Sequence, residues 1–338
     1  MVALNHSFFM RLAISEAWKY QLLTYPNPAV GAVVVGSNGE LLAVNAHQEA
    51  GKAHAEVLAI RDAYVKSSGD CELAKCDDAH ILHSELAKRA GTLFFQSTIY
   101  VTLEPCSHTG KTPACADLIS KLGFKRVVIG AMDPNPKAAG GAERLKHKGI
   151  EVITGIEREA CEVLIEPFLK WQTERFIFLK LAQSMNGVID GGIISCESSR
   201  VWVHKVRDKI DLLAIGGNTV RVDRPILDSR LINGKAPDIA ILTSNPDSID
   251  RTIPLFKVPN RKVNFINSVS SLPKSGLVMV EGGSGTLQAL QNEIDWMVLF
   301  ITPFVKEGNC YNGIKNFELL HQTKIDRDAM LWLKVKDE

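Results

Sequence analysis

The chain has 338 residues, 46% of them hydrophobic and 23% charged, and its 39 basic and 38 acidic side chains leave a net charge of +1. These values fit a globular protein of about two domains and exclude a disordered, collagen-like or low-complexity chain. A nearly neutral chain has no bulk charge to hold nucleic acid, and no apolar run is long enough to predict a membrane span.

The first half alternates strands and helices, as an α/β layered domain does. In chain order the pattern predicts a helix over 1–24, strands over 29–36 and 40–46 around an Asn38-Gly39 turn, helices over 54–65 and 78–90, a strand over 98–103, a helix ending near 122, a strand over 125–131, a helix, and a strand over 149–155.

A second α/β block follows a connecting helix expected over 156–172. Its predicted strands cover 176–184, 209–216, 238–243, 276–282 and 295–302. We expect a first domain over 1–150, a connecting segment over 151–174 and a second domain over 175–338.

The chain contains seven cysteines, an odd number that does not suggest a disulfide framework. Reduced thiols or metal ligands in a cytoplasmic protein fit this number better. The N-terminal stretch carries early charges and does not have the pattern of a signal peptide.

Three separated motifs in the first half predict a metal site. His54 and Glu56 open a predicted helix, Cys106 follows a strand, and Cys115 lies nine residues further on. One imidazole and two thiolates make a three-ligand zinc site, whose free fourth position lets zinc lower the pKa of a bound water. Glu56 is close enough to move protons without being a ligand, which is the arrangement of zinc deaminases.

Other readings of these residues remain open. His108 could close the site as a fourth ligand of a structural zinc, and a lone cysteine is usually a small core residue. A second metal could bind Cys71, Cys76, His80 and His83, although their stretch also has the pattern of an ordinary amphipathic helix.

A glycine-rich loop in the second half suggests a phosphate site. The sequence GLVMVEGGSGTLQAL predicts a strand, a loop and a helix, so that backbone N–H groups near Gly283 could approach a phosphate. The loop lacks the full dinucleotide fingerprint, and a simple strand-to-helix turn explains it equally well.

The motifs NPAVGAVVV, HAE, TLEPCSHTGKTPAC and MDPNP resemble the bifunctional riboflavin-biosynthesis deaminase/reductase family. In the second half FLKLAQSMNG, TVRVDRPIL and VEGG are similar to its reductase domain. The resemblance implies a cytidine-deaminase-like three-layer αβα domain followed by a dihydrofolate-reductase-like α/β domain.

For the first half the resemblance implies zinc on His54, Cys106 and Cys115 and a catalytic Glu56. The implied substrate is a small phosphoribosylaminopyrimidine, 2,5-diamino-6-(5-phosphoribosylamino)pyrimidin-4-one, whose 2-amino group is released as ammonia. Candidate substrate contacts are Asn27 and Lys111, which could equally be a turn residue and a solvated lysine. Asp133 and Asn135 lie in a loop that could hold the ribose phosphate.

For the second half the resemblance implies NADPH reduction of the ribosyl group to ribityl. Cofactor contacts then fall on Ala182, Thr219, Asp223, Gly283, Ser284 and Gly285, and substrate contacts on Arg207, Leu227, Arg230 and Glu281. Asp223 is the expected catalytic carboxylate beside the nicotinamide. As alternatives, Asp223 could be a turn residue, and Arg207 and Arg230 could form surface ion pairs.

The chain departs from the family pattern in several places. Residues 67–97 include an insertion of about 25 residues. Asn186 stands where the family often has Asp, Gly191 where a Ser contacts substrate, and Ile193 where a Trp is common. A deaminase with a non-catalytic or altered reductase-like domain is therefore the alternative function. The family implies a homo-oligomer, and neither a nucleic acid nor a membrane is an expected partner.

Overall fold

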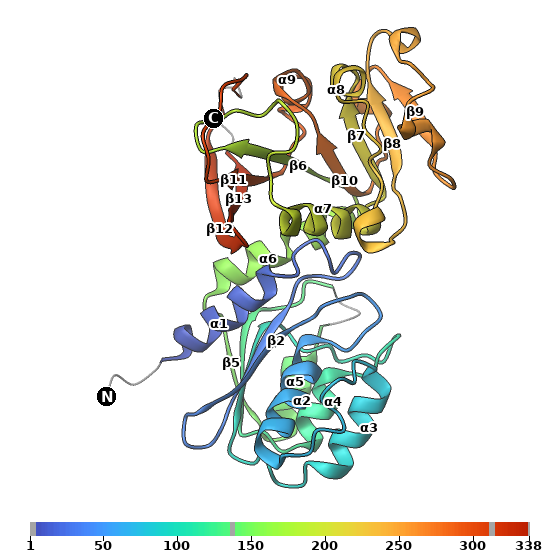
Figure 1. The fold of residues 1–338 in the computed structure, drawn as a ribbon. Helices are drawn as coiled ribbons and strands as arrows, with labels where there is room; N and C mark the ends of the chain where they lie inside the picture. Colours follow the sequence, from blue (N-terminus) through green and yellow to red (C-terminus); the bar gives the residue numbers. More distant parts are fainter. Residues whose placement is uncertain (1–4, 136–138, 311–314, 337–338) are drawn as a thin grey trace. The chain divides into compact units, whose positions relative to one another are not determined.

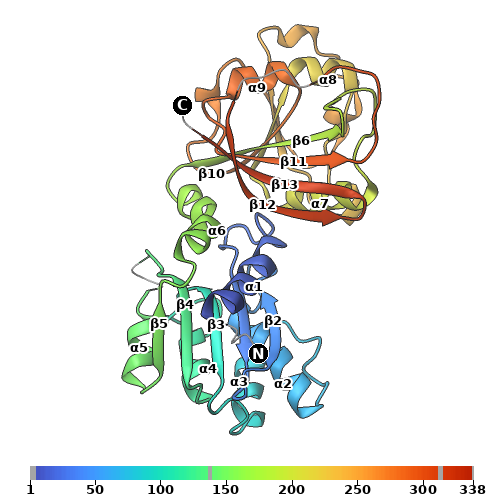
Figure 2. The ribbon, with the colours of Figure 1, turned by 90° about the vertical axis from the view of Figure 1, so that its left-hand side faces the viewer.

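The computed structural model describes residues 5–135, 139–310 and 315–336. Its contacts divide the chain into two compact units, Met1–Phe168 and Leu169–Glu338, whose elements can be followed in Figures 1 and 2. The division falls inside helix α6 (Arg158–Trp171). The last strand of the first sheet, β5 (Glu151–Thr154), lies within the stretch expected to be a connecting segment.

The first unit is built on a five-stranded sheet. Its order is β2 (Leu41–Ala46), β1 (Gly31–Val35), β3 (Thr98–Leu103), β4 (Arg126–Ala131) and β5. β1 runs antiparallel to both neighbours, whereas β3, β4 and β5 are parallel. Parallel strands bring their carboxyl ends, and the loops that follow them, to the same edge of the sheet.

Helices cover both faces of this sheet. α1 (His6–Trp18) lies on one face, and α2 (Ala55–Ser68), α3 (Ala79–Arg89), α4 (Cys115–Lys121) and α5 (Gly141–His147) lie on the other (Figures 1 and 2). Every residue of β1 is consequently buried. A Cβ on Gly31 would lie 1.9 Å from the carbonyl oxygen of Ala13, so only glycine allows α1 to pack this closely. The expected three-layer αβα fold is confirmed.

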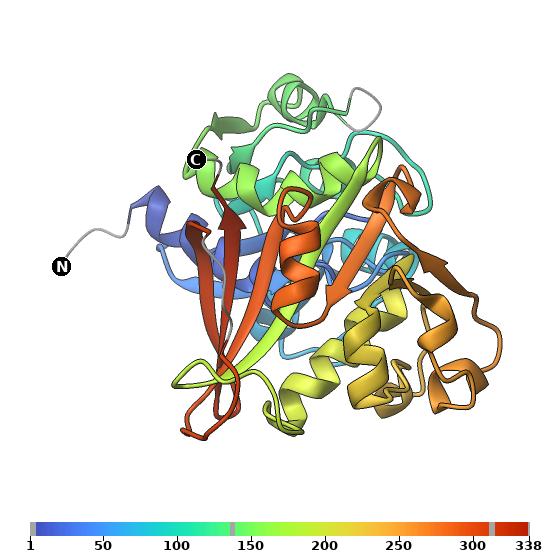
Figure 3. The ribbon, with the colours of Figure 1, turned by 90° about the horizontal axis from the view of Figure 1, so that it is seen from above.

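The second unit contains an eight-stranded sheet. Its order is β12 (Phe317–Ile325), β13 (Asp328–Val335), β11 (Trp296–Thr302), β6 (Arg175–Ser184), β10 (Gly276–Glu281), β7 (Leu212–Gly216), β8 (Asp238–Leu242) and β9 (Val263–Ile266). From β11 to β9 neighbouring strands are parallel, and β12 and β13 add an antiparallel hairpin (Figure 3). The expected α/β reductase-like fold is confirmed.

Alternate residues of β6 point to the two faces of the second sheet. Ile177, Leu179 and Leu181 join an apolar cluster on one face. On the other face, Phe176 packs edge-on against Trp296, with ring centroids 5.4 Å apart, and Trp296 packs against Trp332. These two layers fix the strands whose carboxyl ends carry the cavity described below.

Several expectations about elements are corrected. The first helix ends at Trp18 and turns follow it to residue 27, whereas residues 1–4 of the expected 1–24 helix lie outside the described residues. The sequence analysis missed α7 (Glu197–Lys209), α8 (Gly217–Asp223), β9, β12 and β13. In the described part of the chain, no helix has the length and apolar character needed to cross a membrane.

Candidate active sites

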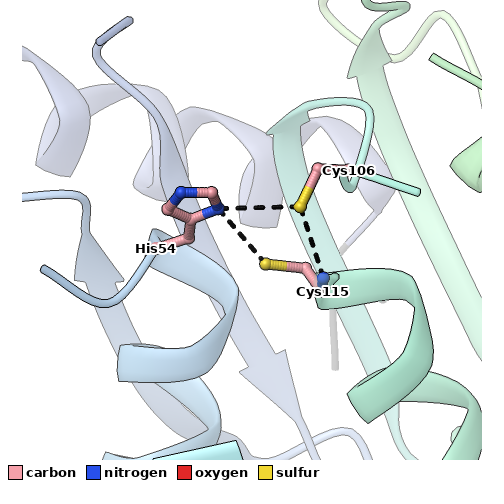
Figure 4. Close-up of side chains that lie close together, drawn as sticks. All are labelled: His54, Cys106 and Cys115. Carbon is pink, nitrogen blue, oxygen red and sulfur yellow. Dashed lines mark hydrogen bonds between the residues drawn. The ribbon is translucent and has the colours of Figure 1, made fainter. Parts of the chain in front are cut away.

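The three predicted zinc ligands meet at the edge of the first sheet. His54 is the N-cap of α2, Cys106 follows β3, and Cys115 is the first residue of α4 (Figure 4). The Nδ1 atom of His54 lies 3.8 Å from the Sγ of Cys106 and 3.4 Å from the Sγ of Cys115. All three donor atoms lie within 4.8 Å of one another.

This donor set fits zinc. An imidazole nitrogen and two thiolates are ligands that zinc prefers, and three protein ligands leave one tetrahedral position open. His108 lines the adjoining cavity but does not join the donor cluster. Cys71, Cys76, His80 and His83 form no such cluster within the described ranges. The geometry therefore favours one open site over a closed four-ligand site.

A hydroxyl orients the imidazole of His54. The Oγ1 atom of Thr112 lies 3.3 Å from His54 Nε2, on the side of the ring opposite the two sulfurs. An Nε2–H that donates to this oxygen leaves the Nδ1 lone pair for a metal, as outer partners of zinc-bound histidines commonly do. The sequence analysis did not single out Thr112.

The electrostatics of the site follow from burial. Burial raises the pKa of Glu56 to about 7, although the neighbouring His54 acts in the opposite direction. The hydrogen bond from the Cys115 thiol and the bond to His54 lower the pKa of Cys106 to about 4, against the effect of burial. Glu56 is therefore a carboxyl group that can hold or release a proton near neutral pH.

A cavity of about 370 Å³ opens beside these residues. It is lined by His54, Glu56 and Cys106 and by the four predicted substrate contacts Asn27, Lys111, Asp133 and Asn135. The structure thus brings the predicted deaminase residues together at one opening. Burial raises the pKa of Asp133 there.

His47 is a cavity residue that the sequence analysis missed. Its Nδ1 lies 3.1 Å from the carbonyl oxygen of Ala53, so Nδ1 carries the hydrogen. Its Nε2 then accepts from the amide Nδ2 of Asn27 at 3.1 Å. Burial lowers the pKa of His47 to about 4, which keeps the ring neutral and this orientation of Asn27 fixed.

Glu104 is a second buried residue that was missed. Its carboxylate accepts backbone N–H groups from Asp133 at 3.2 Å, Gly140 at 3.1 Å and Ala142 at 2.9 Å. It therefore holds both ends of the loop between β4 and α5 against the cavity. Its position just before Pro105-Cys106 was the available signal in the sequence.

In the second unit, a cavity of about 690 Å³ lies at the carboxyl ends of β6, β7 and β10. The predicted reductase residues that line it are Ala182, Arg207, Thr219, Asp223, Leu227, Arg230, Glu281, Gly283 and Ser284. Gly285 instead lines a neighbouring cavity of about 420 Å³, which shares Thr219, Gly283 and Ser284 with the first. A Cβ on Gly282 would lie within 3 Å of Thr286 side-chain atoms, so this turn requires glycine.

Arg207 does not present a free guanidinium to this cavity. Its Nε and Nη2 lie 3.1 Å and 2.7 Å from one oxygen of Glu281, and its Nη1 donates to the carbonyl of Asp228. Burial would raise the pKa of Glu281, but the charges of Arg207 and Lys180 leave it lower than usual. The structure therefore places Arg207 on the cavity wall in an ion pair with Glu281.

The other predicted reductase contacts differ in exposure. Arg230 is exposed and pairs with Asp228 at 2.5 Å. Leu227 is buried with a φ of +58°, and its carbonyl accepts from Arg261 at 2.9 Å. Asp223 ends α8 at the rim of the cavity, where partial burial raises the pKa of its carboxyl.

Comparison with known proteins assigns each half of the chain to a family. Residues 4–131 match the zinc-binding region of cytidine and deoxycytidylate deaminases, and residues 175–306 match the RibD C-terminal domain. The riboflavin biosynthesis protein RibD of Aquifex aeolicus is 32% identical over 334 residues, covering 87% of this chain and 86% of its own length. The RibD protein of Actinobacillus pleuropneumoniae is 37% identical over 237 residues, which cover 68% of this chain and 56% of its own length.

Two solved structures are similar over 98% of this chain. One is a diaminohydroxyphosphoribosylaminopyrimidine deaminase/5-amino-6-(5-phosphoribosylamino)uracil reductase of Thermotoga maritima, with 29% identity, 98% of its chain covered and a TM-score of 0.65. The other is RibD of Acinetobacter baumannii, with 27% identity, 99% of its chain covered and the same TM-score. This chain belongs to the RibD family of riboflavin biosynthesis proteins and is a bifunctional enzyme, with a zinc-dependent deaminase half and an NADPH-dependent reductase half.

Proposed function

We propose that the first half deaminates 2,5-diamino-6-(5-phosphoribosylamino)pyrimidin-4-one, replacing its 2-amino group by a carbonyl and releasing ammonia. The observation that carries this proposal is the position of Glu56. It is a buried carboxyl with a pKa of about 7 in the same cavity as a three-ligand His/Cys/Cys site. A structural metal site would have no use for such a group.

Each residue of this site has a definite task in the proposed reaction. His54, Cys106 and Cys115 would hold zinc, which when bound would supply a water of lowered pKa. Glu56 would take a proton from water in the cavity and deliver one to the leaving amine. Thr112 keeps the Nδ1 of His54 directed at the sulfurs.

The rest of the cavity would select the substrate. Asn27, whose amide nitrogen already donates to His47, has its carbonyl oxygen for the amino groups of the pyrimidine. Lys111 is exposed at the cavity and carries the positive charge that a ribose phosphate would need. Asp133 and Asn135 line the same opening.

For the second half we propose reduction of the ribosyl group of the deaminated product. Ala182, Thr219 and the loop Gly283–Gly285 would bind NADPH, which when bound supplies a hydride. The two adjoining cavities that share Thr219, Gly283 and Ser284 offer a continuous surface for a long dinucleotide. Asp223, at the rim, would deliver the proton that accompanies hydride transfer to C1′.

The substrate of the second half would lie against Leu227 and Arg230. Arg230 is exposed and can turn from Asp228 toward a phosphate. Arg207 and Glu281 neutralise each other, so we propose that this pair shapes the wall of the cavity and offers the second oxygen of Glu281 as an acceptor.

We also propose a cytoplasmic homo-oligomer that takes neither a nucleic acid nor a membrane as partner. All seven cysteines are free thiols, which suits a reducing compartment. β12 ends the second sheet and offers an edge that another copy could pair with. Light scattering on the purified protein would give the number of copies, and a monomer would contradict this proposal.

One assay tests both halves. The zinc-loaded protein is incubated with the diaminopyrimidine substrate and NADPH while ammonia and the absorbance of NADPH are followed. We expect ammonia to appear first and NADPH to be consumed after it. Ammonia without NADPH consumption would favour the alternative of an altered reductase domain. If zinc-bound protein gave no ammonia and consumed no NADPH, the proposed substrate would be refuted.

A further inference from the structure

The segment between α2 and β3, residues 69–97, is an integral part of the first unit. Leu82 and Leu86 of α3 are fully buried, as is Phe94, whose ring stacks on that of Phe124 with centroids 5.0 Å apart. Because the segment contributes to the core, it cannot be regarded as a passive surface loop.

The same segment also contacts Ala53, the residue before the proposed zinc ligand His54, and helix α2. The carbonyl of Asp77 accepts the backbone N–H of Ala53 at 2.9 Å, and Ala53 is fully buried. The Nη1 atom of Arg61, on α2, donates to the carbonyl of Cys76 at 2.6 Å. These bonds tie residues 76–77 to the start of α2.

Helix α3 also contacts the loop that carries Lys111. The Nε2 atom of His80 lies 3.1 Å from the backbone carbonyl of Lys111. A carbonyl only accepts, so Nε2 carries the hydrogen, and this bond is available to the imidazolium and to one neutral tautomer alike. The contact needs no change of protonation to hold the loop.

The loop that carries Lys111, residues 107–112, is also held at both ends by other contacts. Arg144 donates to the carbonyl of Ser107 at 2.8 Å at one end, and Thr112 bonds His54 at the other. Inside the loop, the N–H of Gly110 donates to the carbonyl of Thr112 at 3.1 Å. His80 contacts the stretch between these ends at Lys111, which lines the cavity.

We propose that segment 69–97 is a positioning element of the deaminase site and that His80 is its positioning residue. By holding the carbonyl of Lys111, His80 fixes the backbone from which the Lys111 side chain meets the phosphate end of the substrate. The inference rests on the proposed deaminase function. It gives the segment that sets this chain apart from the family pattern a task in substrate binding.

The test compares three variants of the full-length, zinc-loaded protein. His80→Ala removes the donor, His80→Gln keeps an N–H donor of similar reach, and Ser84→Ala is the matched control on the exposed face of α3. We expect His80→Ala to raise the deaminase KM about two- to tenfold, the range for one hydrogen bond, with kcat within about twofold. His80→Gln should restore the KM, and Ser84→Ala should leave it unchanged.

Two further measurements separate positioning from loss of folding. The reductase rate of the same chain on deaminated substrate should be unchanged in all three variants. Without substrate, amide hydrogen exchange across residues 107–112 should be faster in His80→Ala alone. An unchanged KM in His80→Ala would overturn the inference. If wild type released no ammonia, the proposed function would fail, and unchanged exchange in His80→Ala would then separately refute the contact.

Discussion

Glu56 stands two residues after His54, a proposed zinc ligand, and its proposed task differs because of where α2 begins. His54 caps the helix in an extended conformation, so its ring turns toward the two cysteines, whereas Glu56 already lies inside the first turn. Both side chains reach the same cavity. In this chain the pattern His-x-Glu places the proposed ligand and the proposed proton carrier at one cavity because a helix starts between them.

Replacing Glu56 with Gln should abolish most deaminase activity. The amide keeps the size of the side chain but cannot carry a proton, so we expect ammonia release to fall about 10²- to 10⁴-fold. Zinc content, measured by elemental analysis, and the reductase rate on deaminated substrate should both stay at wild-type values. Undiminished ammonia release would contradict the role of Glu56.

His83 should make α3 sensitive to acid. Burial lowers its pKa to about 4, against about 6.5 in an unfolded chain. The folded state therefore binds fewer protons between these values, and the stability that depends on neutral His83 is present above pH ~6.5 and lost as the pH falls toward 4.

We expect His83→Leu to weaken this dependence. Protection of the α3 amides from hydrogen exchange, corrected for intrinsic rates, should fall less between pH 6.5 and 4.5 in the variant than in wild type. Ser84→Ala, next to it on α3, is the control and should follow wild type. Parallel curves for His83→Leu and wild type would show that His83 does not titrate with folding.

The sequence was enough to predict that His54, Cys106 and Cys115 meet, because a zinc site depends on few residue types at few spacings. It was not enough for Thr112, His47 or Glu104. Each is recognised only by its partner. Thr112 bonds the Nε2 atom of His54, His47 bonds the amide of Asn27, and Glu104 accepts three backbone N–H groups. Such partners come from other elements, and spacing along the chain does not reveal them.

Two loops, one around residues 186–191 and one around residues 306–309, form one wall of the reductase cavity. The amide of Asn186 donates to the carbonyl of Lys306 at 2.9 Å and accepts from its N–H at 3.3 Å. Lys306 Nζ donates in return to the carbonyls of Asp190 and Gly191. Asp190 and Asn309, which are also bonded to each other, line the cavity. Asn186 and Gly191, where the sequence analysis expected departures from the family pattern, therefore both take part in this contact between loops.

Changing Asn186 to Asp should loosen this wall. A carboxylate cannot donate to the carbonyl of Lys306, and its negative oxygen would lie beside the partially negative carbonyl oxygen. We expect the reductase kcat/KM to fall about two- to tenfold, the range for one hydrogen bond, with an unchanged deaminase rate. Asn264→Asp makes the same charge change at an exposed position of β9 and should have no effect. Equal losses in both variants would point to charge alone.

Several strands that the sequence predicted are buried, whereas the missed strand β12 is largely exposed or half-buried. β1, β3, β7 and β10 are short apolar runs that are buried throughout or nearly so, and their hydrophobic pattern is plain. β12 has scattered half-buried positions, and its pairing shifts register between Leu319 and His321. Its residues therefore do not alternate regularly between buried and exposed. Its pairing with β13 is decided by tertiary contacts rather than by local pattern.

For the whole molecule, each cavity is lined by residues of one unit. The deaminase cavity draws on residues 26–168, and the reductase cavity draws on residues 180–310. Each unit also has its own sheet and its own apolar core. The two cavities therefore share no lining residue, and we expect the deaminated product to pass between them by diffusion.

A mixture of two defective proteins tests this independence. Glu56→Gln should lack the first step, and Asp223→Asn should lack the second because its amide cannot deliver the proton. Each variant alone, given the diaminopyrimidine and NADPH, should consume little NADPH. Mixed in equal amounts they should restore NADPH consumption after a lag, because product released by one protein reaches the other. A mixture that stays silent, although Glu56→Gln reduces added deaminated substrate, would instead mean that the intermediate never leaves the protein that makes it.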